Sequence, residues 1–74
     1  MNSIEVFWAV RNPYRLMPDS DLICPPIKVE ADRLHLFANG YKHRWSEFNI
    51  KLYLNEDDAL TDSSNRLHQY GFRL

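Results

Sequence analysis

The chain has a single cysteine, Cys24, and only two glycines, Gly40 and Gly71, among its 74 residues. One cysteine excludes an internal disulfide, and two separate glycines exclude a glycine-rich phosphate loop. No stretch approaches the ~18 consecutive apolar residues of a membrane-spanning helix. The N-terminal residues lack the basic region and apolar core of a signal peptide. Together with the free thiol, these absences predict a cytoplasmic protein that does not enter the membrane.

Residues that could support catalysis or bind a metal are also sparse. Cys24 precedes Pro25-Pro26, with no helix start that would activate its thiol, so it is expected to be a small apolar filler or an edge residue. The histidines His35, His43 and His68 lack the paired short spacings of zinc ligands. No Ser-His-Asp or kinase signature is present. The sequence therefore predicts no enzyme, no metal and no cofactor.

Charge is nearly balanced, with nine Lys and Arg against ten Asp and Glu and a net charge of −1. Such a balance gives no long-range attraction to nucleic acid or to an anionic membrane. Apolar residues make up 45% of the chain, as in an ordinary globular protein. Residues 1–74 are expected to form one small domain. Because burial in so short a chain barely offsets its ordering entropy, added stability is expected from a homodimer or a partner.

Three segments are expected to be strands beside one irregular segment. Residues Ser3–Val10 are expected to form a strand. Apolar residues occur on both of its faces, which favours a central or doubly covered strand. Arg11–Pro26 holds all four prolines and is expected to be irregular, with at most a short or edge strand around Leu22–Cys24. Ile27–Glu30 is expected to be a brief edge strand. Phe48–Leu54 follows a tight turn or bulge at 46–47, and its inward residues are expected to be Phe48, Ile50, Leu52 and Leu54.

One helix is predicted over Asn55–Tyr70. Asn55 is the expected N-cap, and the acidic trio that follows it suits the positive end of the helix dipole. The same trio could also form a negative patch for a basic partner. Gly71 is expected just after the helix, with Phe72 contacting Leu67. The expected inward stripe is Ala59, Leu60, Ser63, Ser64, Leu67 and Tyr70.

Asn39-Gly40 lies between two runs that alternate like strands, Arg33–Ala38 and Tyr41–Trp45. Asn-Gly is typical of a type I′ turn, so the pattern predicts a two-residue β-hairpin whose register is fixed. One face of that hairpin is expected to enter the core, namely Leu34, Leu36, Ala38, Tyr41, His43 and Trp45. The other face is basic and carries Arg33, His35, Phe37, Lys42 and Arg44.

Three interpretations of this basic face stay open. It could be an ordinary solvated surface on which the neighbouring cations cover Phe37. It could dock an acidic surface of another protein, with Phe37 as the anchor. It could also contact phosphates and stack a base, with Phe37 and Tyr53 as stacking platforms, although the net charge argues against nucleic acid. The segment around Tyr14–Met17 is a second candidate for partner contact.

The predicted fold class is α+β, with a small antiparallel sheet of three to four strands and one C-terminal helix packed on one face. The predicted function is that of a small stand-alone inhibitor or adaptor that binds another protein. Such proteins are common products of phages and other mobile elements, where they block host machinery such as a defence nuclease or complex. The alternative is a small nucleic-acid-binding module that uses the basic hairpin face.

Overall fold

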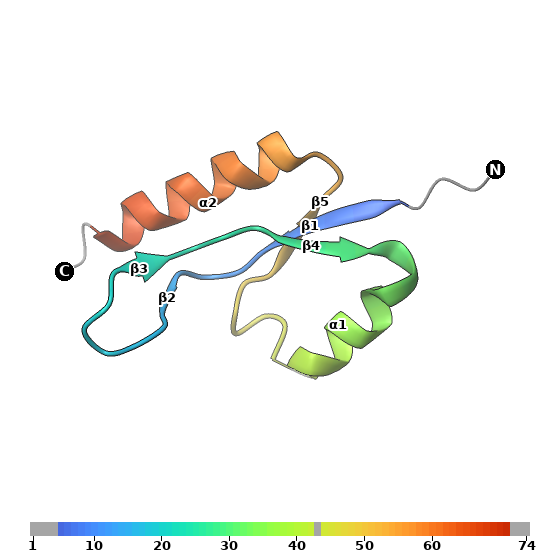
Figure 1. Cartoon of the computed structure of the whole chain (residues 1–74), viewed down its shortest axis with the longest axis horizontal. Helices are drawn as coiled ribbons and strands as arrows, with labels where there is room; N and C mark the ends of the chain where they lie inside the picture. Colours follow the sequence, from blue (N-terminus) through green and yellow to red (C-terminus); the bar gives the residue numbers. More distant parts are fainter. Residues whose placement is uncertain (1–4, 43, 72–74) are drawn as a thin grey trace.

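The computed structural model describes residues 5–42 and 44–71 and shows a small sheet between two helices (Figure 1). The sheet has three antiparallel strands in the order β4-β1-β5, namely β1 (Val6–Val10), β4 (Ile27–Glu30) and β5 (Lys51–Tyr53). The helices are α1 (Leu34–Tyr41) and α2 (Glu56–Gly71). The predicted α+β class is confirmed, including a C-terminal helix on one face of the sheet.

β1 is the central strand and pairs antiparallel with both neighbours. Its two faces are covered by different helices, because successive side chains of a strand point to opposite sides. Ala9 is buried in a cluster that receives Phe37 and Tyr41 from α1, whereas Val10 is buried with Ala59 of α2. The predicted central position is therefore confirmed, although residues 3 and 4 lie outside the described part of the chain.

The edge strands agree with the sequence in part. β4 has the predicted bounds and lies at the sheet edge. β5 is shorter than predicted, since residues 46 and 47 belong to a turn that extends to Asn49. That turn confirms the expected break after Trp45. The inward placement of Leu54 is wrong: this residue follows β5 and is 74% exposed.

The segment predicted to be irregular is a bent continuation of the β1–β4 pair. It contains two short antiparallel strands, β2 (Tyr14–Arg15) and β3 (Leu22–Ile23), joined by a turn at its tip. We call residues 11–26 the ribbon. The prolines account for the brevity of β3, since Pro25 and Pro26 cannot donate to a strand ladder. A short strand at this position was predicted, whereas its hairpin-like pairing with β2 was not.

The hairpin predicted around Asn39-Gly40 is wrong. These two residues lie inside α1, which follows a 3-10 turn at Ala31–Arg33. The inward residues of α1 are Leu34, Phe37 and Tyr41, at the i, i+3, i+7 spacing of a helix face. Leu36, predicted to be core, is 57% exposed. His43, also predicted to be core, lies outside the described residues.

α2 begins as predicted. The Asn55 side chain accepts a 2.7 Å hydrogen bond from the Asp57 backbone N–H, which confirms the N-cap. Its C-terminal end differs, because Gly71 still belongs to the helix and the expected contact of Phe72 lies outside the described residues. The inward stripe is also shifted: Leu60 is 47% exposed, while Arg66 is 6% exposed. Neither helix, over the residues described, is both long and apolar enough to cross a membrane.

Candidate partner-binding surfaces

The structure separates the five residues of the predicted basic face. Phe37 is half-buried in the core cluster beneath α1, where its ring lies 5.1 Å from that of Tyr41 and 5.8 Å from that of Trp45, centroid to centroid. Phe37 therefore points inward, and the prediction of an exposed aromatic anchor is wrong. The physical reason is the helical geometry of α1, which turns Phe37 toward the sheet together with Tyr41.

The four charged members remain on the surface. His35 and Lys42 are exposed on α1 and at its C-terminal end. Arg33 lies before α1, 3.8 Å from Glu30, and Arg44 follows the helix and pairs with Glu47 at 3.0 Å. They lie before, on and after α1 and are not arranged along the face of a hairpin.

Arg44 belongs instead to a stack of alternating cations and aromatic rings. Its guanidinium lies 4.9 Å from the centroid of the Phe48 ring, and that of Arg11 lies 4.3 Å from the same centroid. Arg11 is also 4.6 Å from the Tyr14 ring centroid. Each such contact at an exposed site contributes about 0.5–1 kcal/mol. The stack fastens the base of the ribbon to the turn before β5, with Arg44 at its outer end.

A first groove follows the free edge of β4. It has a volume of about 590 Å³ and is lined by all four residues of β4 together with Arg33, Leu36 and Phe37. Leu36 is the exposed apolar residue of this lining. We call this depression the edge groove. Among residues 5–42 and 44–71, β4 is hydrogen-bonded to β1 on one side and has no strand on the other.

A second groove lies between the ribbon and α2. Its volume is about 430 Å³ and its lining is almost entirely apolar, with Ser63 as the one hydroxyl-bearing member. The lining residues are Leu22, Ile23, Cys24, Pro25, Pro26, Leu60, Ser63 and Leu67. We call it the ribbon groove. Leu60 is the most open of its α2 residues, and the ribbon tip beyond it exposes Leu16 and Met17, at 72% and 64%.

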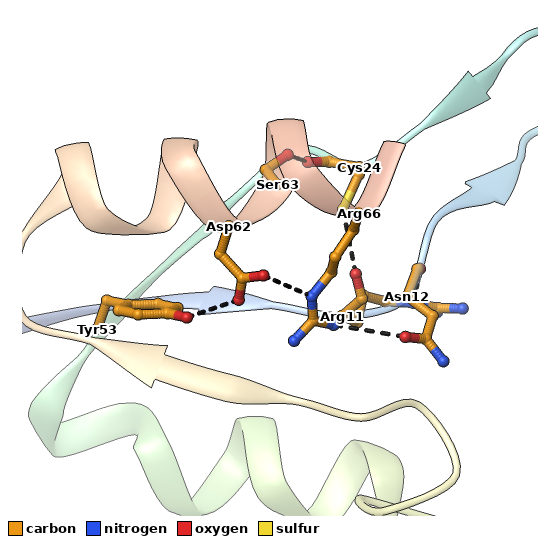
Figure 2. Close-up of polar contacts among 7 residues, drawn as sticks. All are labelled: Arg11, Asn12, Cys24, Tyr53, Asp62, Ser63 and Arg66. Carbon is orange, nitrogen blue, oxygen red and sulfur yellow. Dashed lines mark hydrogen bonds and ion pairs between the residues drawn. The ribbon is translucent and has the colours of Figure 1, made fainter. Parts of the chain in front are cut away.

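Polar contacts join α2 to β5 and to the ribbon (Figure 2). Tyr53 on β5 donates a 2.6 Å hydrogen bond to Oδ2 of Asp62, and Nε of Arg66 donates a 2.9 Å bond to Oδ1. Arg66 also reaches Oδ1 of Asn12 in the ribbon at 3.5 Å. A buried arginine is costly unless it is paired, so Asp62 is its necessary counter-ion.

The electrostatics of this network follow from those contacts. The hydrogen bond to Asp62, together with burial, raises the pKa of Tyr53 to about 12, because ionised Tyr53 would face a carboxylate. Burial alone would raise the pKa of Asp62. The hydrogen bonds from Tyr53 and Arg66 outweigh burial and hold that pKa below its usual value. The Asp62 carboxylate therefore stays charged near neutral pH.

Cys24 connects the two arms of the ribbon to α2. The Ser63 hydroxyl donates to the backbone carbonyl of Cys24, and the Cys24 thiol donates to the carbonyl of Arg11 at 3.1 Å (Figure 2). Cys24 is 4% exposed, which confirms its role as a buried filler. The described part of the chain contains no group of three or more His, Cys, Asp or Glu side chains arranged to hold a metal ion.

The chain matches no known family model, and neither the curated proteins nor the solved structures include one significantly similar to it.

Sequence reasoning missed both grooves. The ribbon groove depends on the outward position of Leu60, which the helical stripe assigned to the core. One signal was available: Ala59, Ser63 and Arg66 share a face at i, i+4, i+7, and small residues there allow close contact with the sheet. The edge groove is lined in part by α1, and the hairpin interpretation predicted no helix there. Of the predicted site residues, only Arg33 and Phe37 line it.

Proposed function

We propose that the protein acts by binding another protein through the ribbon groove and carries out no chemistry of its own. The observation that supports this is an open, almost wholly apolar groove on a chain of 74 residues. Apolar surface left open beside exposed leucines is typical of interaction sites in soluble proteins. Leu60 and Leu22 would be its main contact residues, and Leu16 and Met17 would extend the contact along the ribbon.

The charges near this surface indicate the chemistry of the partner. Glu56 and Asp57 are exposed in the first turn of α2, within four residues of Leu60. Asp19 and Asp21 are exposed beside the apolar residues of the ribbon tip. A partner that suits both ends would present an apolar ridge flanked by Lys or Arg, because such charges would meet carboxylates at the rim.

We propose a role as inhibitor or adaptor because the chain is small and because its proposed activity is binding alone. A small protein that binds without catalysis changes its partner by covering a surface or by joining two proteins. Phage and mobile-element proteins that block a host defence complex have this character, and we propose this setting for the chain.

The nucleic-acid alternative is less well supported by the geometry. Base stacking requires an exposed aromatic face beside the cations. Phe37 is packed beneath α1, and the hydroxyl of Tyr53 is bonded to Asp62 beneath α2. Arg33, His35, Lys42 and Arg44 could still contact phosphates. Retention on single-stranded nucleic acid at low salt that decreases steeply with added salt would support this alternative.

The test is an affinity pull-down from a lysate of the source organism with tagged wild-type protein and the Leu60→Asp variant. Leu60 is 47% exposed, so its replacement should leave the fold intact while placing a charge in the groove. We expect a partner that the wild type retains and the variant loses. Direct binding of the purified partner by calorimetry should then weaken at least tenfold, which corresponds to about 1.4 kcal/mol.

Two control variants make this experiment specific. Leu54→Asp makes the same chemical change at a leucine that is 74% exposed and does not line the ribbon groove. Arg44→Glu tests the predicted basic residues. Retention by Leu60→Asp together with loss in Arg44→Glu would move the interface to the α1 side and refute the ribbon groove as the site.

A further inference from the structure

We infer that the free edge of β4 is a self-association surface, through which two copies of this chain pair β4 with β4 in antiparallel fashion. The inference does not depend on the proposed function, since β4 lies apart from Leu60 and the ribbon tip. It depends on which backbone groups β4 leaves open and on the order of charges along it.

The register of the sheet determines which groups are open. The Ala31 backbone N–H donates to the Glu5 carbonyl at 2.8 Å, and hydrogen-bonded positions alternate along an antiparallel pair. In the same register Val29 lies opposite Phe7. Residues 27, 29 and 31 therefore direct their backbone groups toward β1. Lys28 and Glu30 direct theirs to the outer edge, where each offers one N–H and one C=O.

Only one register of a β4–β4 pair forms hydrogen bonds to all of these backbone groups and also places opposite charges next to each other. In this register Lys28 lies opposite Glu30 of the second copy and Glu30 opposite its Lys28, with Val29 facing itself on the two-fold axis. Each Lys28–Glu30 pair exchanges two backbone hydrogen bonds, and its side chains project to the same face as an opposite-charge pair.

The neighbouring registers are disfavoured by the same rules. A shift by one pair in one direction places Lys28 opposite Lys28 and brings in Pro26, which has no N–H to donate. A shift in the other direction places Glu30 opposite Glu30 and moves Lys28 toward Asp32, which is in the 3-10 turn and not in a strand. A lysine on an edge strand usually discourages pairing. Here Glu30, two residues further, gives that lysine a partner in a second copy.

The edge groove adds apolar contact to this pairing. Ile27 and Val29 belong to the core cluster on the α1 face, and Leu36 lines the groove beside them while remaining 57% exposed. A second β4 strand would enter this groove and bring its own Leu36 to the same face. Self-pairing would thereby produce a continuous six-stranded sheet from two three-stranded ones.

The experiment measures self-association by sedimentation velocity over a wide concentration range. The proteins are the wild type, Lys28→Glu, Glu30→Lys, the double variant Lys28→Glu/Glu30→Lys, and an equimolar mixture of the two single variants. We expect a wild-type dimer whose dissociation constant rises roughly tenfold to a hundredfold in each single variant, since two attractive cross-strand pairs become repulsive. The double variant and the mixture should regain wild-type association, because both restore opposite charges.

Matched controls are Glu47→Lys and Lys42→Glu, which make the same charge changes at exposed positions outside β4. Circular dichroism and thermal unfolding establish that each variant folds. A wild type that stays monomeric overturns the inference, as do single variants that associate like the wild type or control variants that dissociate equally. If a monomeric wild type captures its partner and Glu30→Lys does not, the edge receives a strand of another protein instead.

Discussion

The hydroxyl of Tyr53 on β5 donates a 2.6 Å hydrogen bond to Asp62 on α2, and the same carboxylate accepts a bond from the buried Arg66. This places a charged pair between a helix and a sheet in a domain with a small apolar core. Such a pair is stable only while every member keeps its partner. The network therefore governs how this protein responds to pH and to substitution.

Tyr53→Phe should lower the free energy of unfolding near neutral pH. It should also remove the part of the decrease in that free energy at alkaline pH that is due to Tyr53. The lost hydrogen bond to a charged acceptor should cost about 1.5 kcal/mol near neutral pH. In the folded wild type the pKa of Tyr53 is raised from 10.0 to about 12. Its contribution to stability is therefore fully present below the unfolded pKa and is lost as pH rises through that interval. Urea unfolding measured across this range should show that loss.

In this pH range, comparison of the wild type with Tyr53→Phe isolates the contribution of the Tyr53 hydroxyl. Its unfolding free energy should lack the part of the alkaline decrease that belongs to Tyr53. An ultraviolet difference titration of wild type against variant should show one tyrosine ionising late. Equal alkaline decreases in both proteins would contradict the assignment.

Asp62→Asn should be more damaging than any surface carboxylate substitution. It leaves the guanidinium of Arg66 buried without a counter-ion, which should cost about 3 to 5 kcal/mol. The folded pKa of Asp62 lies below its usual 3.8. Its stabilisation is therefore complete above the unfolded pKa and lost as pH falls through the folded one.

The matched control is Asp19→Asn at the exposed ribbon tip, which should change the free energy of unfolding little. The free energy of unfolding, measured by tryptophan fluorescence, should decrease more with falling pH for the wild type than for Asp62→Asn. The prediction fails if the two substitutions have the same effect at neutral pH.

Gly40→Ala should stabilise the protein. Gly40 lies inside α1 without a positive φ, and an added Cβ would meet nothing within 4 Å. Replacing a helical glycine with alanine contributes about 0.5 to 1 kcal/mol. The urea midpoint should therefore rise with an unchanged slope. In a type I′ hairpin the same substitution would destabilise, so the sign of the change distinguishes the two structures.

Lys42→Gly should also stabilise the protein, for a different reason. Lys42 caps α1 with φ 52° and ψ −118°, a conformation that glycine adopts without steric cost. The gain should be about 1 kcal/mol. Lys42→Ala keeps the strained Cβ and should show no such gain in thermal unfolding. Equal stability of the two variants would refute strain at this position.

Several features of the fold were predictable because local chemistry determines them. Asn55 has a side chain suited to cap a helix, and three acidic residues follow it at the positive end of the helix dipole. Pro25-Pro26 restricts pairing before β4. The apolar residues on both faces of β1 indicated a central strand.

The hairpin could not be excluded by local pattern because Leu34, Leu36 and Ala38 fit a period of two as well as part of a helical turn. Tertiary structure decided between the two. A central strand with two apolar faces needs two covering layers, and α2 can supply only one. The stripe of Leu34, Phe37 and Tyr41 supplies the other.

The candidate surfaces were less predictable than the fold. Arg33, His35, Lys42 and Arg44 are exposed as expected, but the change from hairpin to helix places them before, on and after α1 and not along one hairpin face. The ribbon groove is lined by both Leu22 and Leu60, which lie far apart in sequence and share a groove only when α2 packs against the ribbon. No periodicity within one segment could indicate such a site.

The anchoring of the ribbon to α2 has a consequence for how tightly the proposed partner would bind. Ser63 holds the carbonyl of Cys24 on one arm, and Arg66 reaches Asn12 on the other. The Ser63–Cys24 bond therefore joins the two walls of the ribbon groove directly, and the Arg66–Asn12 contact holds the other arm of the ribbon on the same helix. A preorganised site loses little conformational entropy on association, so more of the contact energy appears as affinity. Cutting the Arg66–Asn12 anchor should leave every groove-lining residue unchanged yet weaken the proposed binding through the flexibility it restores.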